Sequence, residues 1–180
     1  MSVRILITGG TFDKEYDEIK GKLFFDKTHI KELLDLGRCR LEVNISTLML
    51  IDSLIMTNQD RLRIKNSCKE VYEKQIVITH GTDTMTKTAT ILAKEKLDKT
   101  IVLTGAMIPY NFGSSDGLFN VGSALAFSQA LPSGVYIAMN AYFINGENTG
   151  ISVKSRCKVF VINMLNLSDL ELSSKVSSLS

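Results

Sequence analysis

Short apolar runs recur along the chain, separated by stretches whose apolar residues follow a helical period. The runs at residues 3–7, 75–79 and 100–104 are rich in isoleucine, valine and leucine, and a turn containing glycine follows each of them. Continuous apolar runs of this length are typical of strands that are buried on both faces of a sheet. We therefore predict three buried strands, each running into a tight turn.

Further strand patterns flank these three. Residues 41–47 alternate apolar and polar side chains, and residues 135–139 and 157–162 form additional short apolar runs. Asn145-Gly146, after the apolar residues 142–144, is a typical hairpin turn. The pattern therefore predicts strands at residues 41–47, 135–139 and 157–162 and an antiparallel hairpin near the C-terminus.

Four segments with apolar residues at helical spacing are predicted to be helices. They are a helix capped by Thr28 and ended by Gly37, one opened by a capping box of Thr57 and Asp60 and continuing to about Glu73, one carrying Met85, Ala89 and Leu92, and one capped by Asp116 and continuing through Ala130.

Strands that alternate with helices indicate an α/β fold of three layers, in which a largely parallel, Rossmann-like sheet is flanked by helices. The length of 180 residues is that of one domain. We expect this domain to span residues 1–165 and to be followed by a polar, serine-rich tail at residues 166–180 that is frayed.

Composition and charge exclude several classes of protein. With 21 basic and 19 acidic residues the net charge is only +2, which gives no electrostatic case for nucleic-acid binding. No apolar run approaches the roughly 18 residues of a membrane helix, and the N-terminus does not resemble a signal peptide. Cys39, Cys68 and Cys157 form no CxxC pair, and His29 and His80 are the two histidines, so we expect no metal site. Reduced thiols of this kind indicate a cytoplasmic protein.

The candidate chemistry lies in three turns that follow the buried strands: Thr8-Gly9-Gly10-Thr11, residues 79–83 (THGTD), and Thr104-Gly105. The carboxyl ends of neighbouring parallel strands form a crevice, and glycines there let exposed N–H groups approach a ligand or a developing oxyanion. Thr11 and Thr82 are candidate nucleophiles, provided that a nearby base accepts the hydroxyl proton. Asp83, Tyr16 or a lysine inside the crevice could serve as that base.

Two plainer interpretations compete with this one. Strand-to-helix turns commonly contain glycine and threonine without any catalytic role. A phosphate-binding loop is the other alternative, but the sequence has no GxxxxGKS/T motif and no complete GxGxxG motif.

The motifs resemble those of a known family. Thr8-Gly9-Gly10-Thr11 and residues 80–85 (HGTDTM) closely resemble the two characteristic motifs of the bacterial-type L-asparaginase/glutaminase family, and residues 99–109 and 114–120 agree with it in the same order. The resemblance runs from residue 3 to about residue 144. It implies hydrolysis of L-asparagine through an acyl-enzyme, without a cofactor or a metal; glutamine remains an alternative substrate.

The resemblance also implies roles for particular residues. Thr11 resembles the family's primary nucleophile, and Tyr16 resembles the mobile-loop tyrosine that contacts it. Thr82, Asp83 and Lys99 resemble the family's second threonine, aspartate and lysine, in which a desolvated lysine of lowered pKa acts as a base. Which threonine attacks first stays open.

Substrate contacts are expected from the same turns. Ser53 resembles the serine that holds the substrate carboxylate, and Gly10, Gly81 and Ala106 are expected to line the substrate site together with Thr82 and Asp83.

Each of these residues also has an alternative role. Thr11 could cap a turn, Asp83 could cap the following helix, Lys99 could be solvated, and Tyr16 could be an ordinary loop aromatic. His80 is expected to be a hydrogen-bonded structural residue and not a catalyst.

The chain departs from the family in its length. It resembles short members that consist of the first domain alone, so it lacks the acidic residue that a neighbouring subunit's second domain supplies. We therefore expect weak substrate affinity and activity, or another side chain in the role of that acidic residue. We also expect a homodimer or homotetramer that covers the exposed surface. The alternative functions are an amino-acid-binding module with little or no catalysis and an amidase that acts on glutamine or another small amide.

Overall fold

The computed structural model describes residues 2–140. Its centre is a parallel sheet of five strands in the order β4-β1-β5-β6-β7. The strands are β1 (Ser2–Gly9), β4 (Glu42–Ile51), β5 (Gln75–Thr79), β6 (Thr100–Thr104) and β7 (Gly134–Ile137). The predicted α/β fold with a largely parallel sheet is confirmed.

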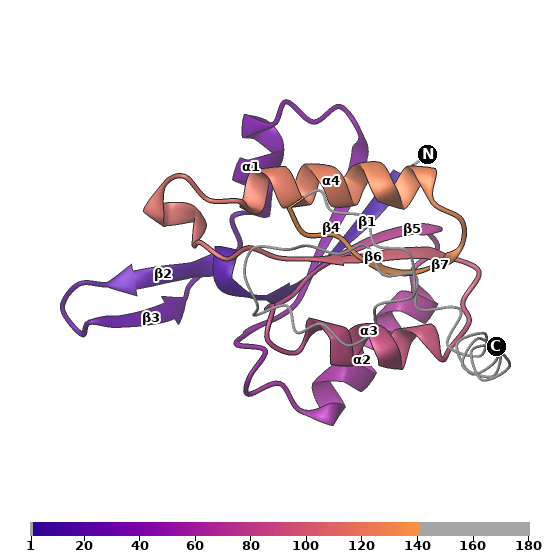
Figure 1. The fold of residues 1–180 in the computed structure, drawn as a ribbon, viewed down its shortest axis with the longest axis horizontal. Helices are drawn as coiled ribbons and strands as arrows, with labels where there is room; N and C mark the ends of the chain where they lie inside the picture. The colour runs from indigo at the N-terminus through magenta and orange to yellow at the C-terminus, as the bar shows by residue number, and fades with distance from the viewer. Residues whose placement is uncertain (1, 141–180) are drawn as a thin grey trace, which may run out of the picture.

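Helices cover both faces of the sheet. Helices α1 (Ile30–Leu36) and α4 (Gly117–Ala130) lie on one face, and α2 (Asn58–Glu70) and α3 (Met85–Ala93) lie on the other (Figure 1). Each face buries its own apolar cluster, because successive side chains of a strand point to opposite faces. In β5, for example, Ile76 and Ile78 pack toward α2 and α3, whereas Val77 packs toward α1 and α4.

Most predicted boundaries agree with the structure to within a few residues. The capping box of Thr57 and Asp60 is present at the start of α2, although this helix ends at Glu70 and not near Glu73. The N-cap of α1 is His29 and not Thr28, whose hydroxyl instead accepts a hydrogen bond from the Ile30 N–H.

Asp116 does precede α4, but its carboxylate does not cap that helix. It accepts hydrogen bonds from the N–H groups of Met107 and Ile108, and from the Asn120 amide. The side chain therefore organises the loop after β6.

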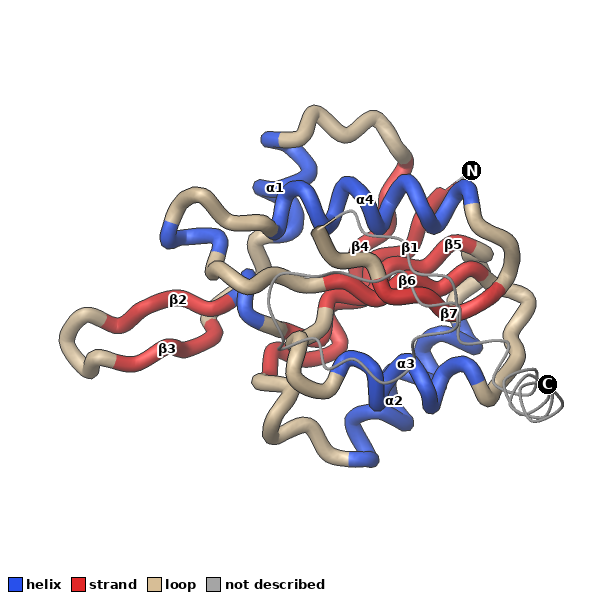
Figure 2. Tube along the Cα trace, in the orientation of Figure 1, coloured by secondary structure: helices blue, strands red, loops and turns tan. Residues whose placement is uncertain are grey.

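An antiparallel hairpin near the N-terminus is the element that the sequence pattern did not predict. Strands β2 (Lys14–Asp17) and β3 (Lys22–Phe25) pair with each other and project from the body of the domain (Figure 2). The Asp17 carboxylate accepts from the N–H groups of Ile19 and Lys20, and this closes the turn. The predicted hairpin after residue 140, the strand at 157–162 and the tail lie outside the described residues.

Two short 3₁₀ turns, η1 (Thr11–Asp13) and η2 (Tyr110–Phe112), follow β1 and β6. No helix within residues 2–140 is long and apolar enough to cross a membrane.

Candidate active site

The turns after β1, β5 and β6 meet at the carboxyl edge of the sheet, where glycines allow very close packing. Gly10 has φ 109°, and a Cβ on it would lie 2.8 Å from the His80 carbonyl carbon. A Cβ on Gly105 would collide with the His80 carbonyl oxygen. Side chains larger than hydrogen at these positions would separate the turns, so the glycines are required for their convergence.

The second threonine turn packs against the loop that follows β4. A Cβ on Gly81 would lie 2.5 Å from the Ser53 Oγ. Ser53 is only 1% exposed, and within the described residues its hydroxyl has no hydrogen-bond partner. A buried, unpaired hydroxyl is costly unless a bound group satisfies it, so Ser53 has the character expected of a ligand contact.

The two candidate nucleophiles follow neighbouring strands. Thr11 begins η1 directly after β1 and is half-buried, and Thr82 lies three residues after β5 and is 9% exposed. Because β1 and β5 are adjacent, and because Gly10 packs on the backbone of His80 and Gly81, both threonines belong to one end of the sheet.

Asp83 and Ala106 occupy the same edge. Asp83 is an exposed residue directly after Thr82, and the N-cap position of α3 is the next residue, Thr84. Ala106, in the loop after β6, is fully buried.

His80 is held as a neutral structural residue. Burial lowers the pKa of His80 to about 4. Its two ring nitrogens lie 2.8 Å from the Gly81 carbonyl oxygen and 2.8 Å from the Thr88 hydroxyl. Nε2 thus ties the end of β5 to Thr88 of α3, and Nδ1 is bound within the turn, as expected for a structural histidine.

Lys99 lies at the opposite edge of the sheet, so the expectation that it works with Thr82 is wrong. It precedes β6, and Thr79 at the end of β5 pairs with Thr104 at the end of β6. At about 3.3 Å per residue, the five residues of β6 separate Lys99 from the threonine turns by roughly 16 Å.

The Lys99 ammonium instead caps the C-terminus of α2. It donates to the carbonyl oxygen of Cys68 at 2.8 Å and to that of Val71. Burial lowers the pKa of Lys99, as expected for a catalytic lysine. The lysine nevertheless lies at the amino edge of the sheet, away from the threonine turns at the carboxyl edge. The alternative of a solvated lysine is also wrong, because these carbonyl groups bind it.

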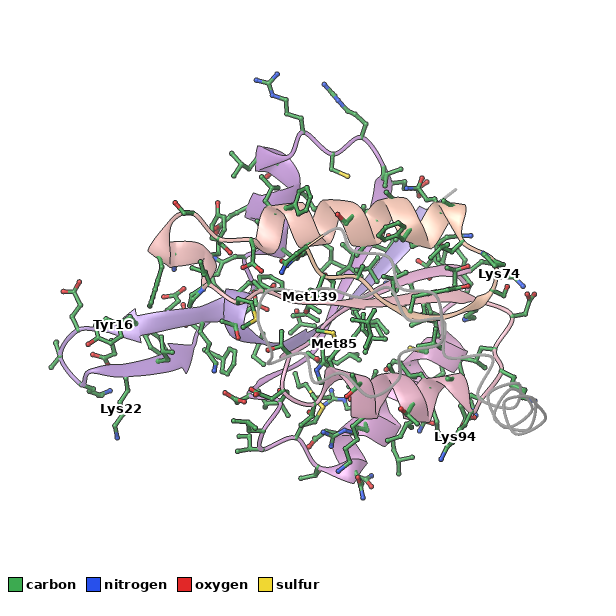
Figure 3. The ribbon with its side chains drawn as sticks, in the orientation of Figure 1. Tyr16, Lys22, Lys74, Met85, Lys94 and Met139 are labelled. Carbon is green, nitrogen blue, oxygen red and sulfur yellow. The ribbon has the colours of Figure 1, made fainter. Side chains whose placement is uncertain are left out.

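Tyr16 lies on the projecting hairpin and is 52% exposed (Figure 3). Its ring packs edge-on against Phe112 of η2, with 6.4 Å between the ring centroids. The contact between Tyr16 and Thr11 therefore stays a prediction.

An ion pair beside Ser53 was not predicted from the sequence. The Lys14 ammonium, three residues after Thr11, lies 2.5 Å from the Asp52 carboxylate. Burial acts to raise the pKa of Asp52, but Lys14 and the Leu54 N–H outweigh it, so the pKa is lowered. The pair joins the Thr11 turn to the Ser53 loop, and no periodicity or motif links two residues 38 positions apart.

A second buried group, Asp13, lies at the base of the hairpin. Its carboxylate accepts from the Thr28 hydroxyl and the His29 N–H, while its other oxygen has no partner within the described residues. Burial raises the pKa of Asp13 to about 6, against the opposing effect of these hydrogen bonds.

A family model described as "Asparaginase, N-terminal" matches residues 2–170. The chain belongs to the asparaginase family.

Similar asparaginases come from several organisms. A glutaminase-asparaginase of Pseudomonas fluorescens biotype A is 30% identical over 176 residues, which is 88% of this chain and 48% of that protein. The solved structure of the thermostable L-asparaginase from Thermococcus kodakarensis is 29% identical, with a TM-score of 0.68 over 77% of this chain and 44% of that one. For a probable cytoplasmic L-asparaginase from Campylobacter jejuni the identity is 32% and the TM-score 0.64, over the same shares. The chain thus spans about half the length of the relatives that it matches.

Proposed function

We propose that this asparaginase-family chain hydrolyses L-asparagine to L-aspartate and ammonia. The observation that carries the proposal is that the Thr11 turn packs on the Thr82 turn, which in turn packs on Ser53, and that the buried Ser53 hydroxyl lacks a partner within the described residues. Nucleophile candidates and an unsatisfied polar contact thus lie at the strand ends where ligands bind in parallel α/β folds.

The reaction begins when a threonine hydroxyl oxygen attacks the side-chain carboxamide carbon and its proton passes to a base. Backbone N–H groups beside Gly10 and Gly81 are the proposed donors to the oxyanion. The base then returns the proton to the nitrogen, the tetrahedral intermediate collapses with loss of ammonia, and an ester to threonine remains. Water hydrolyses this ester, which releases aspartate and restores the hydroxyl. Which of Thr11 and Thr82 attacks first stays open.

The base is a group other than Lys99. Asp83, Tyr16 and another lysine are the candidates. Lys14 is the lysine closest in the chain to Thr11, and residues 141–180 contain Lys154, Lys158 and Lys175. Replacing each lysine separately by methionine tests them, because loss of a base lowers kcat and shifts its pH profile without unfolding the protein.

A second candidate function is amino-acid binding without efficient catalysis. The position of Lys99 favours it, because this lysine, which was matched to the catalytic role, binds the carbonyl groups at the end of α2 and not the threonine turns. Ammonia release from asparagine and glutamine separates the two functions. If neither amide yields ammonia between pH 6 and 9 while aspartate still binds by calorimetry, the protein is a binding module.

We further propose a cytoplasmic homodimer or homotetramer. The named cytoplasmic relative supports the location. Leu54 and Ile55, which directly follow Ser53, are 64% and 72% exposed, and this supports a covered surface beside the site. Light scattering that shows a monomer at micromolar concentration would reject the assembly.

A further inference from the structure

Arg61 is the largest fully buried side chain of the described residues, with 1% of its surface exposed. It lies in the first turns of α2, where the capping box orients the helix. One guanidinium nitrogen, Nη1, donates to the carbonyl oxygens of Met56 at 2.6 Å and Thr57 at 3.0 Å.

The charge of this guanidinium has no ion-pair partner among residues 2–140. Asp60 is the neighbouring acid, but its carboxylate is at the surface and accepts from the N–H and hydroxyl of Thr57. Burial lowers the pKa of Arg61, yet an arginine stays protonated at any ordinary pH. A buried positive charge is costly unless an anion compensates for it.

The other nitrogen connects Arg61 to the candidate active site. Nη2 donates to the Thr84 hydroxyl at 2.8 Å, and that hydroxyl in turn donates to the Ser53 carbonyl oxygen at 2.9 Å. Thr84 follows the Thr82-Asp83 turn directly. One guanidinium therefore holds the Ser53 loop against the start of α3, where Thr82 and Asp83 are placed.

The field of Arg61 also reaches this turn. The Arg61 charge contributes, after burial, to the lowered pKa of His80, which precedes Gly81. The Arg61 charge reaches His80, and the neighbouring Gly81 packs on the Ser53 hydroxyl. We therefore expect an anion bound beside this hydroxyl to experience the same positive potential, since low-polarity surroundings screen charges weakly.

We infer that Arg61 is a positioning residue of the asparaginase site, which holds Ser53 through Thr84 and supplies the buried positive charge that the α-carboxylate of the substrate compensates. The inference rests on the proposed function and deepens it, because it selects amides that carry a carboxylate over amides that lack one. Among residues 2–140 no acid forms an ion pair with this guanidinium, so the carboxylate of the bound substrate would complete the pair.

A purely structural role for Arg61 is the competing explanation. Its bonds to Met56 and Thr57 stabilise the start of α2, and losing them would weaken the fold whatever the substrate. The two explanations make different predictions for substitutions of Arg61. If Arg61 acts on the site, the loss of binding depends on the carboxylate of the substrate, and lysine, which keeps the charge, restores the binding. If Arg61 is purely structural, neither is expected.

The test compares Arg61→Met, Arg61→Lys and Thr84→Val with the wild type. Substrates are L-asparagine and β-alaninamide, which keeps the amide and the amine but has no carboxylate. The dissociation constant of L-aspartate is measured by calorimetry. We expect Arg61→Met to raise the KM for asparagine and the Kd for aspartate about tenfold or more, with kcat changed less than threefold. We expect kcat/KM for β-alaninamide to fall by a much smaller factor than kcat/KM for asparagine, and Arg61→Lys to recover much of the binding.

Equal losses for both substrates, or no recovery with lysine, would overturn the inference in favour of a structural role. If Arg61→Met does not fold, Arg61→Lys and Thr84→Val carry the comparison: Arg61→Lys should bind aspartate nearly as tightly as the wild type, and Thr84→Val should bind it more weakly than the wild type. A wild-type protein that neither releases ammonia nor binds aspartate would overturn the proposed function together with this inference. Wild-type binding that no variant alters would overturn the inference alone.

Discussion

Replacing Lys99 by methionine should weaken the fold and leave the candidate active site intact. Methionine keeps the apolar stem of the side chain and removes the ammonium, which donates to the carbonyl groups of Cys68 and Val71 at the end of α2. These carbonyl groups are among those that a helix leaves unpaired at its C-terminus.

The expected loss follows from the strength of these contacts. A hydrogen bond from a charged donor is worth about 1.5–3 kcal/mol, and a cation at a helix C-terminus adds about 0.3–1 kcal/mol. Water replaces part of both contributions, because Lys99 is only half-buried. We therefore expect Lys99→Met to lower the free energy of unfolding by about 1.5–3 kcal/mol.

Urea unfolding at pH 7 measures this loss, and aspartate binding and ammonia release measure the site. Lys74→Met is the matched control, because Lys74 lies at the same edge of the sheet and, among residues 2–140, forms its ion pair with the exposed Asp98 (Figure 3). The control should change stability little. If folded Lys99→Met protein has normal stability but loses binding or turnover, the assignment of Lys99 to the α2 cap is refuted.

Other substitutions test the site and the pH response. Thr11→Ala and Thr82→Ala should each lower kcat at least 100-fold, and near-full activity in either variant would remove that residue from catalysis. Gly81→Ala should lower the free energy of unfolding by about 1–3 kcal/mol and weaken aspartate binding, because its Cβ meets the buried serine hydroxyl. Gly122→Ala is the control: its Cβ enters open space, so thermal unfolding should show α4 stabilised by up to about 1 kcal/mol. The pKa of Asp13 is about 6 in the folded protein, against an ordinary value of 3.8. The free energy of unfolding, measured by urea titration, should therefore fall by up to about 3 kcal/mol from pH 4 to pH 7. Asp13→Asn should flatten this fall, and an unchanged slope would contradict the assignment.

The sign of the Asp13 effect follows from proton binding. Between pH 3.8 and about 6 the folded protein binds more protons at this carboxyl than the unfolded chain does, so raising the pH favours unfolding. Ordinary ion-paired carboxylates, such as Asp52, act in the opposite direction, because their folded pKa is lowered.

The parallel sheet and its helices were predictable because their signals are local. Each buried strand is one apolar run, and the capping box of Thr57 and Asp60 spans only three residues. The projecting hairpin escaped prediction because its strands carry charged residues such as Lys14, Glu15 and Lys22, and its turn depends on the Asp17 side chain and not on an Asn-Gly pair.

The sequence by itself determined which turns carry glycine next to threonine, and hence the family and the edge of the sheet where chemistry is placed. Only the tertiary structure decided which distant side chains reach that edge. Strand direction moved Lys99 to the opposite end, and packing brought Lys14 to Asp52 and Arg61 to Thr84. The physical reason is that backbone pattern and turn residues act over a few positions, whereas contacts between charged side chains depend on how complete elements are stacked.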